Sequence, residues 1–155
     1  MKTILLPTDF SDNAKNVWKY ELEEEIKTKF KIYSQDNFFT PFASGSSEYN
    51  NMIICPCSMG SMAKIANGLA SDLLSRAADV ILKERGKLVL LTREMPYNLV
   101  HIENMKKITL AGGIICPASP SFYHHPKTIE ELVDTVIIRA LKLLNIKTES
   151  KFWGK

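Results

Sequence analysis

Four short apolar runs are the feature that most limits the fold of this chain. They lie at residues 3–6, 52–55, 88–91 and 113–116, and stretches of more than 20 residues separate each run from the next. Runs of this length without regular polar positions are typical of strands that are buried on both faces. The sequence therefore predicts a sheet that other elements cover on both sides.

Helical patterns fill the intervals between these runs. They cover residues 11–29, 61–67, 71–84, 98–110 and 128–144, and a weaker strand candidate lies at residues 30–33. Strands that alternate with helices indicate an α/β protein with a parallel sheet. With no repeat and no linker in its 155 residues, we expect a single domain over 1–155.

Composition narrows the class of function. The formal net charge of +3 permits an anionic ligand but gives no support for DNA or RNA binding. No apolar stretch approaches the roughly 20 residues of a membrane span. The opening MKTILLPTDF has too short an apolar run for a secretory signal, so we expect a cytoplasmic protein.

The cysteines and histidines do not form a recognisable metal-binding pattern. Cys55, Cys57 and Cys116 are an odd number, and no C-x-x-C is present, so buried free thiols are the expected state. The adjacent His124 and His125 cannot easily present both rings to one metal ion. We therefore expect no metal. Nucleotide-binding loops of the G-x-x-x-x-G-K-[ST] and G-x-G-x-x-G types are also absent from the sequence.

Polar residues follow three predicted strands where each strand ends. They are Cys57-Ser58, Arg93-Glu94 and the segment 117–121. Ligands of open α/β sheets bind outside the carboxyl ends of the strands. The sequence therefore predicts a site at this edge.

A narrow charged stripe lies on the predicted helix 71–84. Its members are spaced four, three and four residues apart, which places them on one helix face: Asp72, Arg76, Asp79 and Lys83. A ladder of exposed ion pairs and a ligand-binding wall are equally good interpretations. The ion-pair ladder is the usual interpretation of such a stripe, and the binding wall equals it here because the stripe is narrow and leads toward the strand that ends at Arg93.

Arg139 lies inside or at the edge of the apolar stripe of helix 128–144, which opens with the capping box Thr128–Glu131. A guanidinium there must meet a carboxylate, a phosphate or a subunit boundary. A salt bridge to Glu94 is the alternative to ligand binding. The Ser- and Gly-rich loop 36–51 could aim N–H groups at an anion, but a simple polar connection is the better interpretation.

Two stretches resemble a known family. CSMGSMAKIANG with RAADVILKERGKLVLLTREMP, followed by AGGIICPASPSFYHHP, is similar to the flavin prenyltransferases, formerly called polyprenyl-hydroxybenzoate or aromatic-acid decarboxylases. The likeness runs from about Ser11 to the C-terminal tail. The combination of RAADVxLKER, RExP and an xxFY…P loop is specific.

The resemblance implies a Rossmann-like, flavodoxin-type subunit of a homododecamer with sites between subunits. Members join a dimethylallyl group from dimethylallyl monophosphate to N5 and C6 of reduced FMN and release phosphate, without a metal. The product, prenylated FMN, serves a partner decarboxylase of the ubiquinone-pathway type.

The resemblance also implies roles for residues at matching positions. Flavin contacts are expected from Ser11, Ser58, Met59, Gly60, Ser61 and Arg93. Prenyl-phosphate contacts are expected from Arg76, Lys83, Tyr123 and Arg139. Lys83 is expected to assist departure of the phosphate, and Glu23 and Glu94 are the candidate acid/base carboxylates.

The chain departs from the family at its start. It lacks the G-[SA]-[SA]-G loop, begins near the family's second unit, and opens like a universal stress protein with MKTILLPTDFS. Gly86 and Ser61-Met62 replace a common arginine and Thr-Leu. Because the loop would supply N–H groups to the FMN phosphate, the alternative function is an FMN- or nucleotide-binding flavoprotein without transferase activity. A direct decarboxylase is the third hypothesis.

Overall fold

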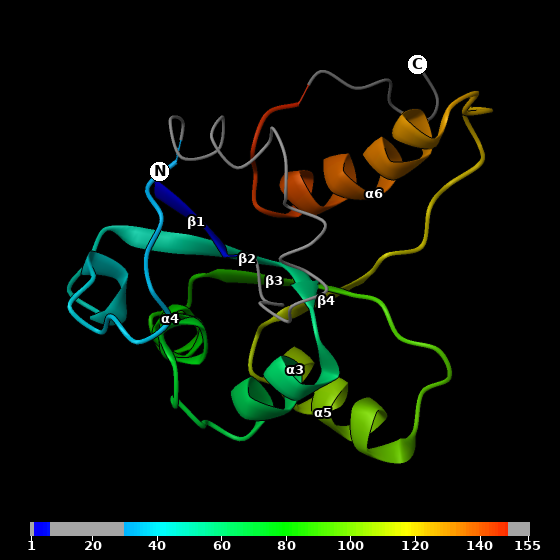
Figure 1. Ribbon diagram of the computed structural model, residues 1–155. Coiled ribbons are helices and arrows are strands. Elements are labelled where there is room, and N and C mark those ends of the chain that lie inside the picture. The colour runs from blue at the N-terminus through cyan, green and yellow to red at the C-terminus, as the bar shows by residue number, and fades with distance from the viewer. Residues whose placement is uncertain (1, 7–29, 149–155) are drawn as a thin grey trace.

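A four-stranded parallel sheet forms the centre of the protein (Figure 1). The structure, a computed structural model, describes residues 2–6 and 30–148. The sheet order is β1-β2-β3-β4, and every neighbouring pair is parallel. The bounds of the strands are Lys2–Leu6, Tyr49–Cys57, Lys87–Thr92 and Ile114–Pro117. Each of the four predicted runs falls wholly or mostly within a strand, so the predicted parallel sheet is confirmed.

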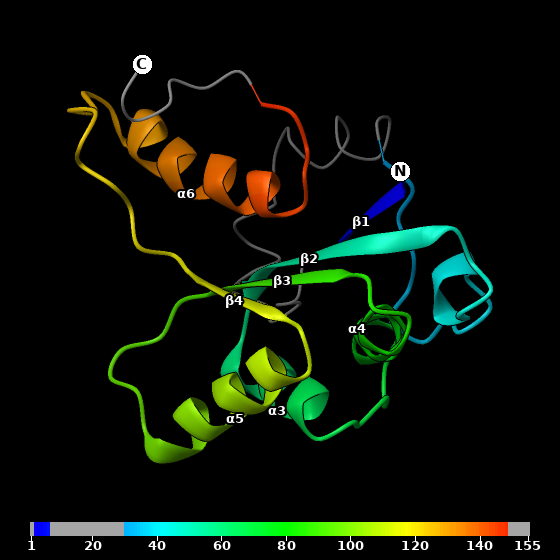
Figure 2. The ribbon, with the colours of Figure 1, turned by 180° about the vertical axis from the view of Figure 1, so that it is seen from behind.

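Helices cover both faces of this sheet. Three of them lie on one face, namely α3 (Met59–Ala66), α4 (Leu73–Lys83) and α5 (Leu99–Leu110), whereas α6 (Ile129–Leu143) lies on the other (Figures 1 and 2). The three-layer, Rossmann-like architecture expected from the sequence is therefore confirmed. Among the described residues, no helix is long and apolar enough to cross a membrane.

Two predicted features differ from the structure or lie outside it. Residues 30–33 form no strand and lead instead into a loop that contains the short 3-10 helix η1 (Pro41–Ala43). Phe30 and Ile32 are exposed there, so this apolar pattern has no sheet face to cover. The predicted helix 11–29 lies outside the described residues, as do Ser11 and Glu23.

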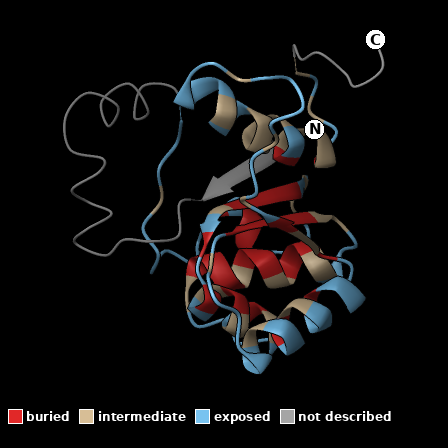
Figure 3. Ribbon diagram, turned by 90° about the vertical axis from the view of Figure 1, so that its right-hand side faces the viewer, coloured by how far each residue is buried: buried red, intermediate tan, exposed pale blue. Residues whose placement is uncertain are grey.

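The main core lies between the sheet and the three-helix layer (Figure 3). Along β2 and β3, alternate side chains point to opposite faces, which is why the central residues 52–55 and 88–91 are apolar without alternation. Met52, Ile54, Leu88 and Leu90 face this core. The smaller cluster on the other face joins Ile53, Val89, Leu91 and Cys116 to Ala140 and Leu144 of the α6 segment.

Side-chain caps set where the helices begin. Asp72 and Asn98 each accept a hydrogen bond from the backbone N–H three residues later, and each is part of a capping box. Thr128 likewise accepts from Glu131 N at 3.1 Å. However, Glu131 Oε2 accepts from Lys127 N rather than from Thr128 N, so only half of the predicted capping box forms.

Candidate functional site at the carboxyl edge of the sheet

Three strand ends lie in register at the carboxyl edge. Cys57 of β2 pairs with Thr92 of β3, and Thr92 pairs with Pro117 of β4. The backbone continues the alignment for one more residue, because Ala118 N donates to Thr92 O at 2.8 Å. The segments that begin at Ser58, Arg93 and Ala118 therefore leave the sheet side by side. The convergence predicted from the sequence is confirmed.

The first of these segments is the turn that opens α3. Ser58 is the N-cap, and its Oγ accepts from Ser61 N at 3.1 Å. Met59 is buried and anchors the turn, whereas Gly60 is exposed. A Cβ placed on Gly60 would meet no atom nearer than Ser58 Oγ, at 3.8 Å. The backbone here faces open space, and the first N–H groups of a helix are well suited to an anion or a carbonyl oxygen.

The second segment carries charge at the end of β3. Arg93 is exposed, and Glu94 is half-buried with its Oε1 accepting from Met95 N at 3.1 Å. Thr92, directly before them, is fully buried, and its hydroxyl has no hydrogen-bond partner among the described residues. A hydroxyl, a guanidinium and a carboxylate thus follow one another in the sequence at one strand end.

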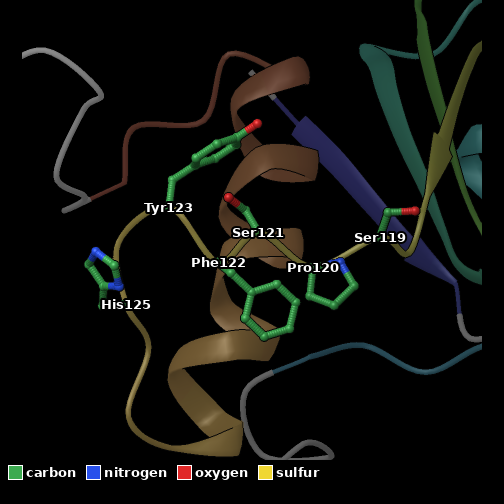
Figure 4. Close-up of a pocket in the computed structure, with 6 residues that line it drawn as sticks. All are labelled: Ser119, Pro120, Ser121, Phe122, Tyr123 and His125. Carbon is green, nitrogen blue, oxygen red and sulfur yellow. The ribbon is translucent and has the colours of Figure 1, made fainter.

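The third segment forms an open pocket after β4. Its volume is about 610 Å³, and it is lined by Ser119, Pro120, Ser121, Phe122, Tyr123 and His125 (Figure 4). Ser121 N donates to Thr135 Oγ1 of α6 at 3.0 Å, which ties this loop to the helix. The rings of Phe122 and Tyr123 are both exposed and point in different directions (Figure 4). The Tyr123 side chain is therefore accessible to a ligand in this pocket.

Arg139 lies near the same strand end. It is exposed, so it occupies the edge of the apolar stripe of α6, next to the fully buried Ala140. Its neighbour Ala140 packs in the same cluster as Cys116 of β4, which brings this turn of α6 close to β4. Burial raises the pKa of the Cys116 thiol, and the Arg139 charge acts in the opposite direction. Within the described residues Arg139 forms no salt bridge to Glu94, the alternative considered above.

Arg76 and Lys83 both lie on α4 and not on the segments that follow the three strands. Helix α4 ends at Lys83, and Gly86 then leads directly into the first residue of β3, Lys87. Lys83 therefore lies at the amino edge of the sheet. The charged stripe therefore ends beside the first residue of the strand that ends at Arg93, and not beside Arg93 itself.

The stripe is also not one continuous ladder of ion pairs. Asp72 pairs with Lys64 of α3 at 2.8 Å, and Arg76 pairs with Asp79 at 3.3 Å. Lys83 pairs with its neighbour Glu84. Arg76 Nε also donates to Ala43 O at 3.0 Å, a contact with η1 that no local sequence pattern signalled.

The three thiols are poor nucleophiles in this fold. Burial raises the pKa of Cys57 to about 12, and a backbone hydrogen bond with Met62 offsets this only slightly. Burial also raises the pKa of Cys55, and the neighbouring Cys116 adds to the effect. All three are free cysteines. No group of three metal-ligating side chains occurs in the part of the chain that the structure describes.

Comparison with known proteins settles the family. The sequence pattern of the flavoprotein family matches residues 7–141. The chain belongs to the flavoprotein family. This family member is 40% identical over 149 residues to the flavin prenyltransferase UbiX of Methanocaldococcus jannaschii, a match that covers 93% of this chain and 81% of the relative. The resemblance inferred from the sequence is confirmed.

Solved structures agree with this assignment. The dodecameric FMN-dependent UbiX-like decarboxylase from Escherichia coli O157:H7 has a TM-score of 0.85 and 31% identity to this flavoprotein. AnUbiX (PadA1) in complex with FMN and dimethylallyl pyrophosphate has a TM-score of 0.81 and 33% identity. Each match covers 97% of this chain and 82% of the solved chain.

Proposed function

We propose that this flavoprotein is a flavin prenyltransferase. It transfers the dimethylallyl group of dimethylallyl monophosphate to reduced FMN, with new bonds at N5 and C6 of the flavin. The carbon–oxygen bond to phosphate breaks, and phosphate leaves. The observation that carries the proposal is the carboxyl edge, where the Ser58 turn, Arg93 and the segment with Tyr123 leave three adjacent strands together.

The residues at this edge fit a flavin mononucleotide. The open backbone at Gly60 admits a planar ring without a side chain in the way. We assign Ser58, Met59, Gly60, Ser61 and Arg93 to flavin binding. A guanidinium and helix N–H groups are donors that suit carbonyl oxygens and phosphate. When bound, FMN supplies the carbon and nitrogen positions that are alkylated.

Tyr123 and Arg139 are assigned to the prenyl phosphate. Both are exposed near the end of β4, and Arg139 can bind two phosphate oxygens at once. Fixed cations stabilise the charge that develops on the departing phosphate. Glu94 is the described carboxylate nearest in sequence to Arg93, and we assign it proton transfer at the flavin. Ser11 and Glu23 keep their proposed flavin and acid/base roles.

Arg76 and Lys83 are proposed to act across a subunit boundary. Both lie on α4, whose last residue, Lys83, is at the amino edge, so within one subunit Lys83 is separated from Arg93 by about the length of β3. In an oligomer such as the dodecamer formed by the Escherichia coli relative, a neighbouring subunit can bring α4 to this edge. We propose a homo-oligomer, with a dodecamer as the expected form.

The product is proposed to serve a downstream decarboxylase that depends on prenylated FMN. The three free cysteines are typical of a reducing compartment, which supports the expected cytoplasmic location. Co-purification with the decarboxylase and cell fractionation test these two points.

Anaerobic incubation with reduced FMN and dimethylallyl monophosphate tests the activity. Mass spectrometry should detect FMN that has gained a dimethylallyl group, together with free phosphate. Bound FMN without this product would support a flavoprotein without transferase activity. Loss of carbon dioxide from an aromatic acid without a second enzyme would support a direct decarboxylase.

A further inference from the structure

The loop that contains η1 lies against the two cations of α4. Arg76 and Lys83 are seven residues apart, which is about two helical turns, so they occupy the same face of α4. That face packs against η1. Arg76 Nε donates to Ala43 O at 3.0 Å, and Arg76 Nη1 lies 3.3 Å from Asp79 Oδ2. These two hydrogen bonds use two of the five donors of the guanidinium.

Gly45 occupies the corresponding place beside Lys83. A Cβ at this position would overlap Lys83 Nζ and Glu84 Oε1. Glu84 in turn pairs with Lys83. The ammonium group therefore occupies space that exists because residue 45 has no side chain.

We infer that Gly45 and Glu84 form a seat that positions the Lys83 ammonium for the prenyl phosphate. Glu84 holds the charge, and the bare Gly45 leaves room for it. This inference rests on the proposed function, because it assigns Lys83 a ligand. Gly45 and Glu84 are positioning residues, and the phosphate contact itself is made by Lys83.

The seat can be disturbed without unfolding the protein. The atoms that a Cβ on residue 45 would meet are the ends of two flexible, half-exposed side chains rather than backbone. Gly45→Ala should therefore displace Lys83 and Glu84 and leave the core intact. Ser44→Ala, in the same loop, is the matched control, because Ser44 Oγ contacts Ser46 Oγ and not the seat.

A double-mutant cycle tests the inference. The quantity measured is the Kd for dimethylallyl monophosphate, by calorimetric titration, because it can be obtained without turnover. We expect Gly45→Ala to raise this Kd about tenfold, with the FMN Kd unchanged, as expected when one charge-assisted contact is misplaced. In a Lys83→Ala background the same substitution should change the Kd no further. Ser44→Ala should leave the Kd unchanged. A similar rise in Kd with and without Lys83, or no rise at all, would overturn the inference.

A second readout does not depend on turnover. Lysine side chains can be labelled with ¹³C-methyl groups, and each labelled lysine then gives an NMR resonance. The resonance of Lys83 is the one that is missing from the spectrum of Lys83→Arg. This resonance should move in Gly45→Ala and stay in place in Ser44→Ala. An unmoved resonance in Gly45→Ala overturns the seat. If the wild-type protein makes no prenylated FMN, the proposed function fails, and this resonance still decides the inference.

Discussion

Arg139 is the residue whose placement ties α6 to the proposed chemistry. Its guanidinium is exposed and lies near Cys116, yet the next residue, Ala140, is fully buried. The helix can therefore hold the backbone of Arg139 firmly while the charged side chain remains accessible to a ligand. The sequence predicted that Arg139 lies inside or at the edge of the apolar stripe. Only the structure could show that, among the described residues, Arg139 forms no salt bridge to Glu94.

Replacement of Arg139 should affect one ligand more than the other. We predict that Arg139→Ala weakens binding of dimethylallyl monophosphate by about tenfold to a hundredfold, the usual effect of losing a charged hydrogen bond. FMN binding should change less than twofold. Calorimetric titration with each ligand measures both. Lys106→Ala, which removes an exposed cation paired with Glu103 on α5, is the control. Equal losses for both ligands would show that Arg139 is structural.

Cys57 should make the protein sensitive to alkaline pH. Its folded-state pKa of about 12 lies above the ordinary value of 9.0, so the buried neutral thiol stabilises the fold fully below pH 9. That contribution is lost as the pH rises from 9 toward 12. Urea unfolding between pH 8 and pH 10.5 should show stability falling, with a smaller slope for Cys57→Ala. An equal slope for both proteins would contradict the assigned pKa.

Local hydrogen bonds explain where the helices begin, and this was largely predictable. Asn98 and Thr128 are helix-capping residue types, and both cap helices that the sequence placed within one residue. Residues 30–33 were predicted as a strand on apolar content alone. No neighbouring strand pairs with that segment, and periodicity carries no information on pairing.

The N-cap of α4 should contribute measurably to the free energy of unfolding. Asp72 caps the helix and pairs with Lys64. We predict that Asp72→Ala lowers the free energy of unfolding by about 1 kcal/mol at pH 7, whereas Asp72→Asn, which can still cap, costs less. Urea denaturation measures the difference.

The effect of Asp72 should depend on acid pH. Partial burial acts to raise the pKa of Asp72, but hydrogen bonds from Lys64 and Ser75 outweigh it, and the pKa falls below the ordinary 3.8. The charged form therefore stabilises the fold above about pH 4, and its contribution disappears as pH drops through the lowered pKa. The gap between wild type and Asp72→Ala should shrink at pH 3. A gap of constant size would contradict this account.

A substitution in the first turn of α3 should change the stability of the protein and its affinity for FMN in opposite directions. Gly60 lies in a helix with open space at its Cβ position, so Gly60→Ala should raise the free energy of unfolding by about 0.5–1 kcal/mol through helix propensity. It should nevertheless weaken FMN binding, because a methyl group would stand where the flavin approaches. Thermal unfolding and FMN fluorescence measure the two effects. The contrasting variant is Gly86→Ala, whose Cβ would lie 2.5 Å from Asn50 O and should destabilise the fold.

If Gly60→Ala left FMN affinity unchanged, the α3 turn would not be part of the flavin site. The structure also explains one departure from the family at Gly86. The close approach of Asn50 O leaves no room for the arginine that is common there.

At the scale of the whole molecule, the sequence predicted the layers but not the direction of α4. Apolar strands and alternating helices are enough to indicate a parallel sheet covered on both faces. The charged stripe of α4 reaches the start of β3 and not its end, because a crossover helix returns the chain to the start of the next strand. Lys83 and Arg93 therefore lie toward opposite edges of the sheet, and the contact between Arg76 and Ala43 joins residues 33 positions apart.

The central claim is that the carboxyl edge of one subunit and α4 of another form one prenyltransferase site. Co-expression of two inactive variants, Arg93→Ala and Lys83→Ala, tests it most directly, with prenylated FMN measured by mass spectrometry. Random mixing in a symmetric oligomer leaves about a quarter of such shared sites with both residues intact. We predict that the mixed protein makes prenylated FMN at about that fraction of the wild-type rate, whereas neither variant alone does. No product from the mixture, beside an active wild type, would contradict the shared site.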